Sequence, residues 1–176
     1  MAENNILINR APVLTLWASI VAERLGFDQD EALTLGKAVA GLNAQSKGQR
    51  LGIFKAVPQE VKKARAQKRG EEFWIEICGR HVPAINTPDG VRAVIKSEPI
   101  DAKSVERYLV SKFGESLGPV REAMRDLAKA FRPELLSTNA FHLYEEFRPA
   151  IPAGVRGWGA KGKLEMDRIR SLVKEK

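Results

Sequence analysis

The spacing of apolar residues follows the helical period over most of this 176-residue chain and changes to the strand period in one region. Between residues 13 and 25, apolar side chains recur at steps of three and four, as they do on one face of a helix. Between residues 72 and 95, Phe73, Ile75 and Ile77 recur at every second position, which is typical of a strand. We therefore predict a helix-dominated α+β fold, with six or seven helices around a small antiparallel sheet at roughly 72–95.

Glycine, proline and capping residues divide the first part of the chain into helices. Pro12 suits the start of a first helix, and Gly26 is placed to end it. Asp28 or Asp30 can cap a second helix, which we expect to stop at the break 46–48.

Small residues inside this second helix predict a close approach by another backbone. Gly36, Ala40 and Gly41 carry little or no side chain. A glycine inside a helix costs about 1 kcal/mol relative to alanine, so tight packing is a reasonable compensation. We favour this structural role over a ligand-binding one.

The last part of the chain is predicted to be helical again. Asp101 is placed to cap a helix, and further helices are expected from Pro119, Pro133 and Asn139, followed by a final one over 164–173. The helix after Asp101 carries a single apolar stripe, formed by Val105, Tyr108, Leu109 and Phe113.

Turn residues divide the strand region into three extended pieces. A turn at 79–80 would lead into a strand over 81–85, and the turn signal at 88–90 would lead into another over 91–95. Pro83 lacks a backbone donor, which predicts that its strand lies at an edge of the sheet.

Length and composition favour one domain, residues 1–176, with a soft boundary near 97–100 that would separate lobes 1–97 and 98–176. No apolar stretch approaches the roughly 18 residues that span a bilayer, so we expect no membrane partner. A lone cysteine, Cys78, and the absence of a secretory signal pattern favour the cytoplasm.

Positive charge is concentrated in two segments. Residues 47–69 hold eight basic side chains and one acidic, and residues 151–176 hold seven basic and three acidic, whereas the rest of the chain is slightly acidic. This segregation favours a polyanionic partner. A basic face that only aids solubility is the alternative interpretation.

We expect the first segment to contact phosphates through a surface helix over 58–70. Lys62, Arg65 and Arg69 share one face of such a helix, a geometry that suits a nucleic-acid backbone and not base readout. The expected contacts of the segment are Lys47, Arg50, Lys62, Lys63, Arg65, Lys68 and Arg69.

A glycine-rich loop over 154–162 is the second candidate site. Its backbone amides, with Arg156 and Lys161, could hold an anion, and Trp158 could stack on a base. The alternative is that the loop docks Trp158 into the core.

Residues 21–35 carry a short motif. Ala22 and Gly26 stand four apart among apolar neighbours, with Ala32 following where a second helix would pack. This pattern resembles the DNA-binding helix-turn-helix. Base-reading side chains are expected on the second helix of such a motif, and here Thr34 and Lys37 are the main candidates. An ordinary helical hairpin in the core is the favoured interpretation.

Catalytic signals are weak. Cys78 lies three residues from His81, but residues at this spacing on a hairpin are not thereby positioned for nucleophilic attack. His142 lies four residues before Glu146 with Glu145 beside it, but a metal site would need further ligands. We expect structural roles for both histidines, and no metal or cofactor. An enzymatic function, the less favoured alternative, would need a concave site that joins His142, Glu146 and a cation.

Two functions follow from these observations. The first is a non-enzymatic nucleic-acid-binding protein, with DNA favoured, that contacts phosphates through the 47–69 segment and the loop 156–163. The second is a protein-interaction module that uses the prolines of 149–152 and Trp158. Nothing in the sequence sets an oligomeric state.

Overall fold

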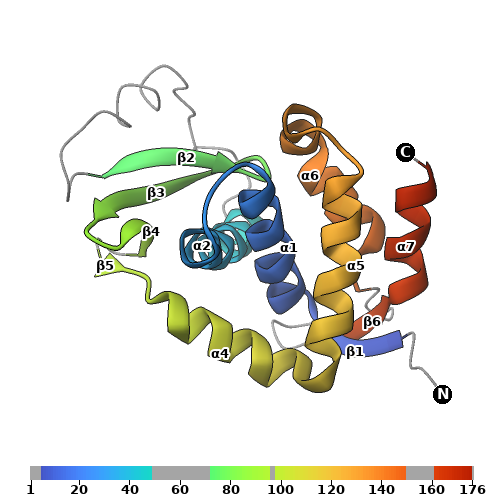
Figure 1. The fold of residues 1–176 in the computed structure, drawn as a ribbon. Helices are drawn as coiled ribbons and strands as arrows, with labels where there is room; N and C mark the ends of the chain where they lie inside the picture. Colours follow the sequence, from blue (N-terminus) through green and yellow to red (C-terminus); the bar gives the residue numbers. More distant parts are fainter. Residues whose placement is uncertain (1–4, 49–71, 96–97, 150–160, 176) are drawn as a thin grey trace.

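The computed structural model describes residues 5–48, 72–95, 98–149 and 161–175. Helices α1 (Arg10–Arg24) and α2 (Gln29–Gly48) pack against each other at the centre of the fold. The sheet lies on the far side of α2, and helices α5, α6 and α7 lie on the far side of α1 (Figure 1). The other elements, in chain order, are β1 (Asn5–Asn9), β2 (Phe73–Ile77), β3 (Arg80–Thr87), β4 (Gly90–Ile95), β5 (Glu98–Pro99), α4 (Ala102–Phe113), the 3-10 turn η1 (Gly114–Ser116), α5 (Leu117–Lys129), α6 (Pro133–Phe147), β6 (Lys161–Glu165) and α7 (Met166–Glu175). The predicted α+β class, dominated by helices, is confirmed.

Helix α1 is buried on every side over most of its length. Each residue from Pro12 to Ala22 is buried, so α1 is a central helix and not an amphipathic surface helix. The indole Nε1 of Trp17 donates a hydrogen bond to the carbonyl of Ala140, 2.9 Å away, and its ring meets that of Phe147 edge to face at 5.3 Å between centroids. Trp17 therefore joins α1 to α6.

The start of α2 is fixed by a reciprocal cap. The Asp28 carboxylate accepts from the Glu31 amide at 2.8 Å, and the Glu31 carboxylate accepts from the Asp28 amide at 3.0 Å. The other oxygen of Glu31 accepts from the Val91 amide at 2.9 Å. One carboxylate thus ties the start of α2 to β4.

The two glycines of α2 differ in their surroundings. A Cβ on Gly36 would collide with the Ser19 hydroxyl and the Thr15 carbonyl of α1 and would lie 2.8 Å from the Ser19 amide nitrogen. A Cβ on Gly41 would meet nothing within 4 Å. The prediction of a close backbone approach is therefore confirmed at Gly36 and wrong at Gly41.

Strands β2, β3, β4 and β5 form an antiparallel sheet in that order, and α2 covers one of its faces (Figure 1). The hydroxyl of Thr34, which is fully buried, accepts from the Ala93 amide at 3.0 Å and donates to the Glu31 carbonyl at 2.9 Å. The β2–β3 turn lies at Cys78 and Gly79, whose φ angles of 52° and 77° suit a two-residue hairpin.

The prediction that Pro83 marks an edge strand is wrong, because β3 lies between β2 and β4. The pairing of β3 with β4 begins at Ala84, however, and Pro83 is opposite Trp74 of β2. Pro83 therefore lies one residue outside the β3–β4 pairing, where its missing backbone N–H removes no hydrogen bond between the strands.

Two predicted helix breaks are also wrong. The backbone of 46–48 remains helical to the end of α2. Helix α6 runs without interruption from Pro133 to Phe147. The Thr138 hydroxyl and the Asn139 side-chain amide donate to carbonyls of the preceding turn, at 3.2 and 2.8 Å, and so do not start a new helix. The Asp101 carboxylate caps α4 as predicted, accepting from the Lys103 amide at 3.2 Å.

A ribbon that the sequence did not predict joins distant parts of the chain. Strand β1 pairs antiparallel with β6, from Asn5 opposite Glu165 to Asn9 opposite Lys161. One cluster of buried apolar side chains draws on both sides of the 97–100 boundary, from Ile8 to Leu172. Among the described helices, none is long and apolar enough to cross a membrane.

Candidate nucleic-acid interface

Most of the residues predicted to contact nucleic acid lie outside the described ranges. These are Arg50, Lys62, Lys63, Arg65, Lys68, Arg69, Arg156 and Trp158. Backbone positions are described for two others: Lys47 belongs to the last turn of α2, and Lys161 is the first residue of β6. The predicted surface helix over 58–70 also lies outside the described residues.

The described residues are electrically balanced. They include 19 of the 29 basic side chains and 19 of the 22 acidic ones, so their formal charge is zero. The other ten basic and three acidic residues carry the whole excess of +7. Residues 49–71 alone hold seven of these basic side chains and two of the acidic ones. The folded elements therefore contribute no net charge that would oppose a polyanion.

Within this balanced part, two lysines from different helices gather at one aromatic ring. The Lys37 ammonium of α2 lies 3.8 Å from the ring centroid of Tyr108 on α4, and the Lys112 ammonium lies 6.0 Å from the same centroid. We call Lys37, Tyr108 and Lys112 the two-lysine site. Cation–π attraction holds Lys37 over the ring, although the two ammonium groups repel each other.

The electrostatics of this site reflect burial and that repulsion. Partial burial lowers the pKa of Lys37, and the positive charge of Lys112 lowers it further. Burial raises the pKa of the Tyr108 hydroxyl. No ion pair joins either lysine to a carboxylate of the described residues, in contrast to Arg121, which pairs with Glu106 at 2.9 Å. The site therefore carries two positive charges without a counterion among those residues.

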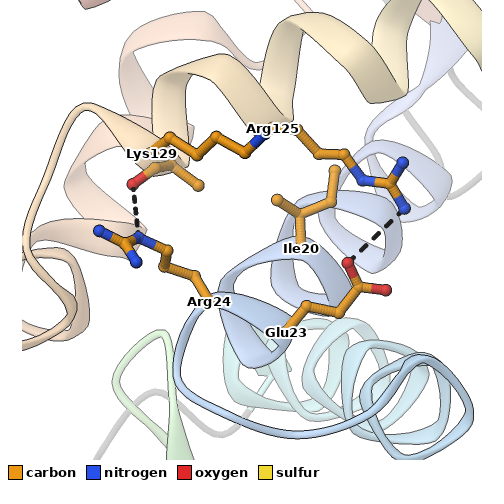
Figure 2. A pocket seen from close by; sticks show the side chains of 6 residues that line it. Ile20, Glu23, Arg24, Arg125 and Lys129 are labelled. Carbon is orange, nitrogen blue, oxygen red and sulfur yellow. Dashed lines mark hydrogen bonds and ion pairs between the residues drawn. The ribbon is translucent and has the colours of Figure 1, made fainter.

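A second group of cations lines a pocket of about 420 Å³ between α1 and α5 (Figure 2). Arg24 donates to the carbonyls of Ala128 and Phe131, at 3.4 and 2.8 Å, and so satisfies the C-terminal end of α5. Arg125 lies 3.6 Å from the carboxylate of Glu23 (Figure 2). Both arginines therefore brace α1 against α5, and this pocket is a weaker anion site than the two-lysine site.

The two polar residues considered as base readers on the second helix have other partners. Helix α2 packs between α1 and the sheet, and Thr34 is committed to the Ala93 amide. Lys37 points to Tyr108 on the neighbouring α4. These contacts fit the interpretation of α1 and α2 as a helical hairpin in the core.

His142 and Glu146 are neighbours on the surface of α6. Their side chains are 3.6 Å apart, and Glu146 also forms an ion pair with Arg168 of α7. The Arg168 Nε donates to the Glu146 carbonyl at 3.1 Å as well. No group of three or more histidine, cysteine or acidic side chains that could hold a metal occurs in the described part of the chain. Glu146 thus links α6 to α7.

Cys78 is buried and will be unreactive in the folded protein. Burial raises the pKa of its thiol to about 12, although Arg80 lowers it slightly. At pH 8, only about one thiol in 10⁴ would be ionised, and the thiolate is the nucleophile. We expect Ellman's reagent at pH 8 to label the native protein at least 100-fold more slowly than the protein unfolded in guanidinium chloride. Rapid labelling in native buffer would contradict this burial.

Sequence reasoning missed the two-lysine site because it assigned Tyr108 to an apolar stripe. Val105, Leu109 and Phe113 of that stripe are buried, whereas Tyr108 is half-buried. A tyrosine four residues before a lysine was the local signal, but the partner on α2 could not be known without the fold.

Comparison with known proteins gives no relative from which a function could be transferred. No protein-family model matches the chain, and no curated protein or solved structure matches it significantly.

Proposed function

We propose that the protein binds nucleic acid, with DNA as the favoured form, through phosphate contacts of residues 47–69. The observation that carries this proposal is the segregation of charge. The described elements have a formal charge of zero, while residues 49–71 hold seven basic side chains and two acidic. Long-range attraction to a polyanion depends on such a local excess, because a balanced surface exerts little net force on it.

Salt dependence tests the proposal. Binding to a fluorescein-labelled duplex of about 20 base pairs is measured by anisotropy between 50 and 200 mM salt. The variant carries glutamine at Lys62, Lys63, Arg65, Lys68 and Arg69. Each lost phosphate contact makes the slope of log K against log salt shallower by about 0.9, so we expect a loss of up to about 4.5. The affinity at 50 mM salt should fall by at least 100-fold.

A matched variant controls for net charge. It also loses five positive charges, but at exposed described positions outside the predicted contacts: Lys103, Arg107, Lys129, Arg132 and Arg170. We expect its slope to change by less than about 1. Failure of the wild type to bind at 50 mM salt, or equal losses in the two variants, would refute the proposal.

The protein-interaction module remains the alternative function. Trp158 and residues 150–152, its predicted contacts, lie outside the described ranges. A protein partner that is retained after nuclease treatment, together with absent DNA binding, would favour it.

A further inference from the structure

We infer that the two-lysine site is a fixed phosphate contact, at which the ammonium groups of Lys37 and Lys112 hold one backbone phosphate of the bound nucleic acid beside the Tyr108 ring. This inference rests on the proposed function and adds a described contact to it. The expected ligand is a backbone phosphate, so the contact would stabilise the complex without selecting a base sequence.

The position of the two charges is the first argument. Lys37 lies on α2 and Lys112 on α4, yet both ammonium groups lie within 6.0 Å of the centroid of one ring. Arg125 and Arg121, in contrast, face Glu23 and Glu106. A bound anion between the lysines would replace their mutual repulsion with two attractions.

The chemistry of the ring selects phosphate over a base as the group bound. Bases bind aromatic side chains by stacking on an open ring face. The Lys37 ammonium covers one face of Tyr108 at 3.8 Å, and the residue is half-buried. Tyr108 therefore acts as a support that positions Lys37, and lysine binds phosphate as a compact point charge.

The path of α2 connects this site to the basic segment. Lys37 and Lys47 are both on α2, and ten helical residues place their backbones about 15 Å apart along the helix axis. A duplex presents one charge per about 1.7 Å of its axis, so it offers many phosphates over that distance. One nucleic-acid strand that meets the start of the basic segment can also reach the two-lysine site.

The test uses the full chain with Lys37 and Lys112 both replaced by glutamine. In the anisotropy assay, we expect the salt slope to become shallower by about 0.9, the value for one phosphate, and the affinity at 50 mM salt to fall about 5- to 20-fold. The control replaces Lys103 and Lys129, which are exposed, and removes the same charge. Lys103 lies nine residues before Lys112, on the opposite face of α4. The salt slope of this control variant should match that of the wild type.

Two further readouts separate binding from a structural role. The Lys37→Arg/Lys112→Arg variant retains both charges and should recover most of the affinity. The thermal midpoint of the glutamine variant should not fall by more than a few degrees, because relief of the repulsion between the two lysines offsets the loss of the cation–π contact. If the wild type binds DNA and the glutamine variant behaves like its control, the inference is wrong and the proposed function stands. If the wild type does not bind, both fail.

Discussion

Replacing Gly36 with alanine will destabilise the protein by at least about 3 kcal/mol. The new Cβ would overlap the Thr15 carbonyl and the Ser19 hydroxyl and would lie 2.8 Å from the Ser19 amide nitrogen. Two of these atoms belong to the backbone of α1, so a change of rotamer cannot relieve the overlap. The helices would have to separate, and α1 is buried throughout this region. Overpacking of this kind typically costs 1–3 kcal/mol, and more where backbone resists.

Gly41 provides the matched control in the same helix. It is exposed, and a Cβ there would have no neighbour within 4 Å. The Gly41→Ala variant should gain about 0.5–1 kcal/mol, because alanine loses less conformational entropy in a helix. Both variants are compared by urea unfolding monitored by circular dichroism. Equal effects of the two substitutions would show that α1 and α2 are not in close backbone contact at Gly36.

Replacing Trp17 with alanine will cost about 3–5 kcal/mol, the range for a fully buried aromatic residue. Its side chain is 0% exposed, and the substitution also removes the hydrogen bond to the Ala140 carbonyl and the edge-to-face contact with Phe147. Trp17→Phe keeps part of the apolar volume but loses the indole N–H that donates to that carbonyl, so about 1–3 kcal/mol is expected.

Trp74 is the control for this substitution, since its side chain is 42% exposed on β2. Trp74→Ala should cost less than half as much as Trp17→Ala. Guanidinium chloride titrations followed by far-UV circular dichroism give each free energy of unfolding. The role assigned to Trp17 would be refuted if both alanine variants lost the same stability.

Elements with signals close together in the sequence were predictable. The Asp101 cap and the stripe of Val105, Leu109 and Phe113 specify α4 from its own residues, and the turn at 88–90 specifies the β3–β4 hairpin. Helix propensity, capping and turn chemistry act over a few residues, so a single sequence reports them.

Features that depend on distant partners were not predictable in this way. Strand β1 is five residues long and pairs with a strand that follows more than 150 residues later. Pro83 was assigned to an edge because its pairing register with β4 was unknown. The two-lysine site could not be predicted for the same reason. Lys37 and Tyr108 are 71 positions apart, and only the packing of α2 near α4 brings them together.

The β1–β6 ribbon has a consequence for the order in which the chain folds. Its innermost pair, Asn9 and Lys161, is 152 positions apart. Closing a loop of that length costs roughly 2 kcal/mol more than closing one of about ten residues, whereas helices form within about a microsecond. We therefore expect the ribbon to form after the helices have packed, so that this helix-rich chain reaches its native state more slowly than its local contacts alone would allow.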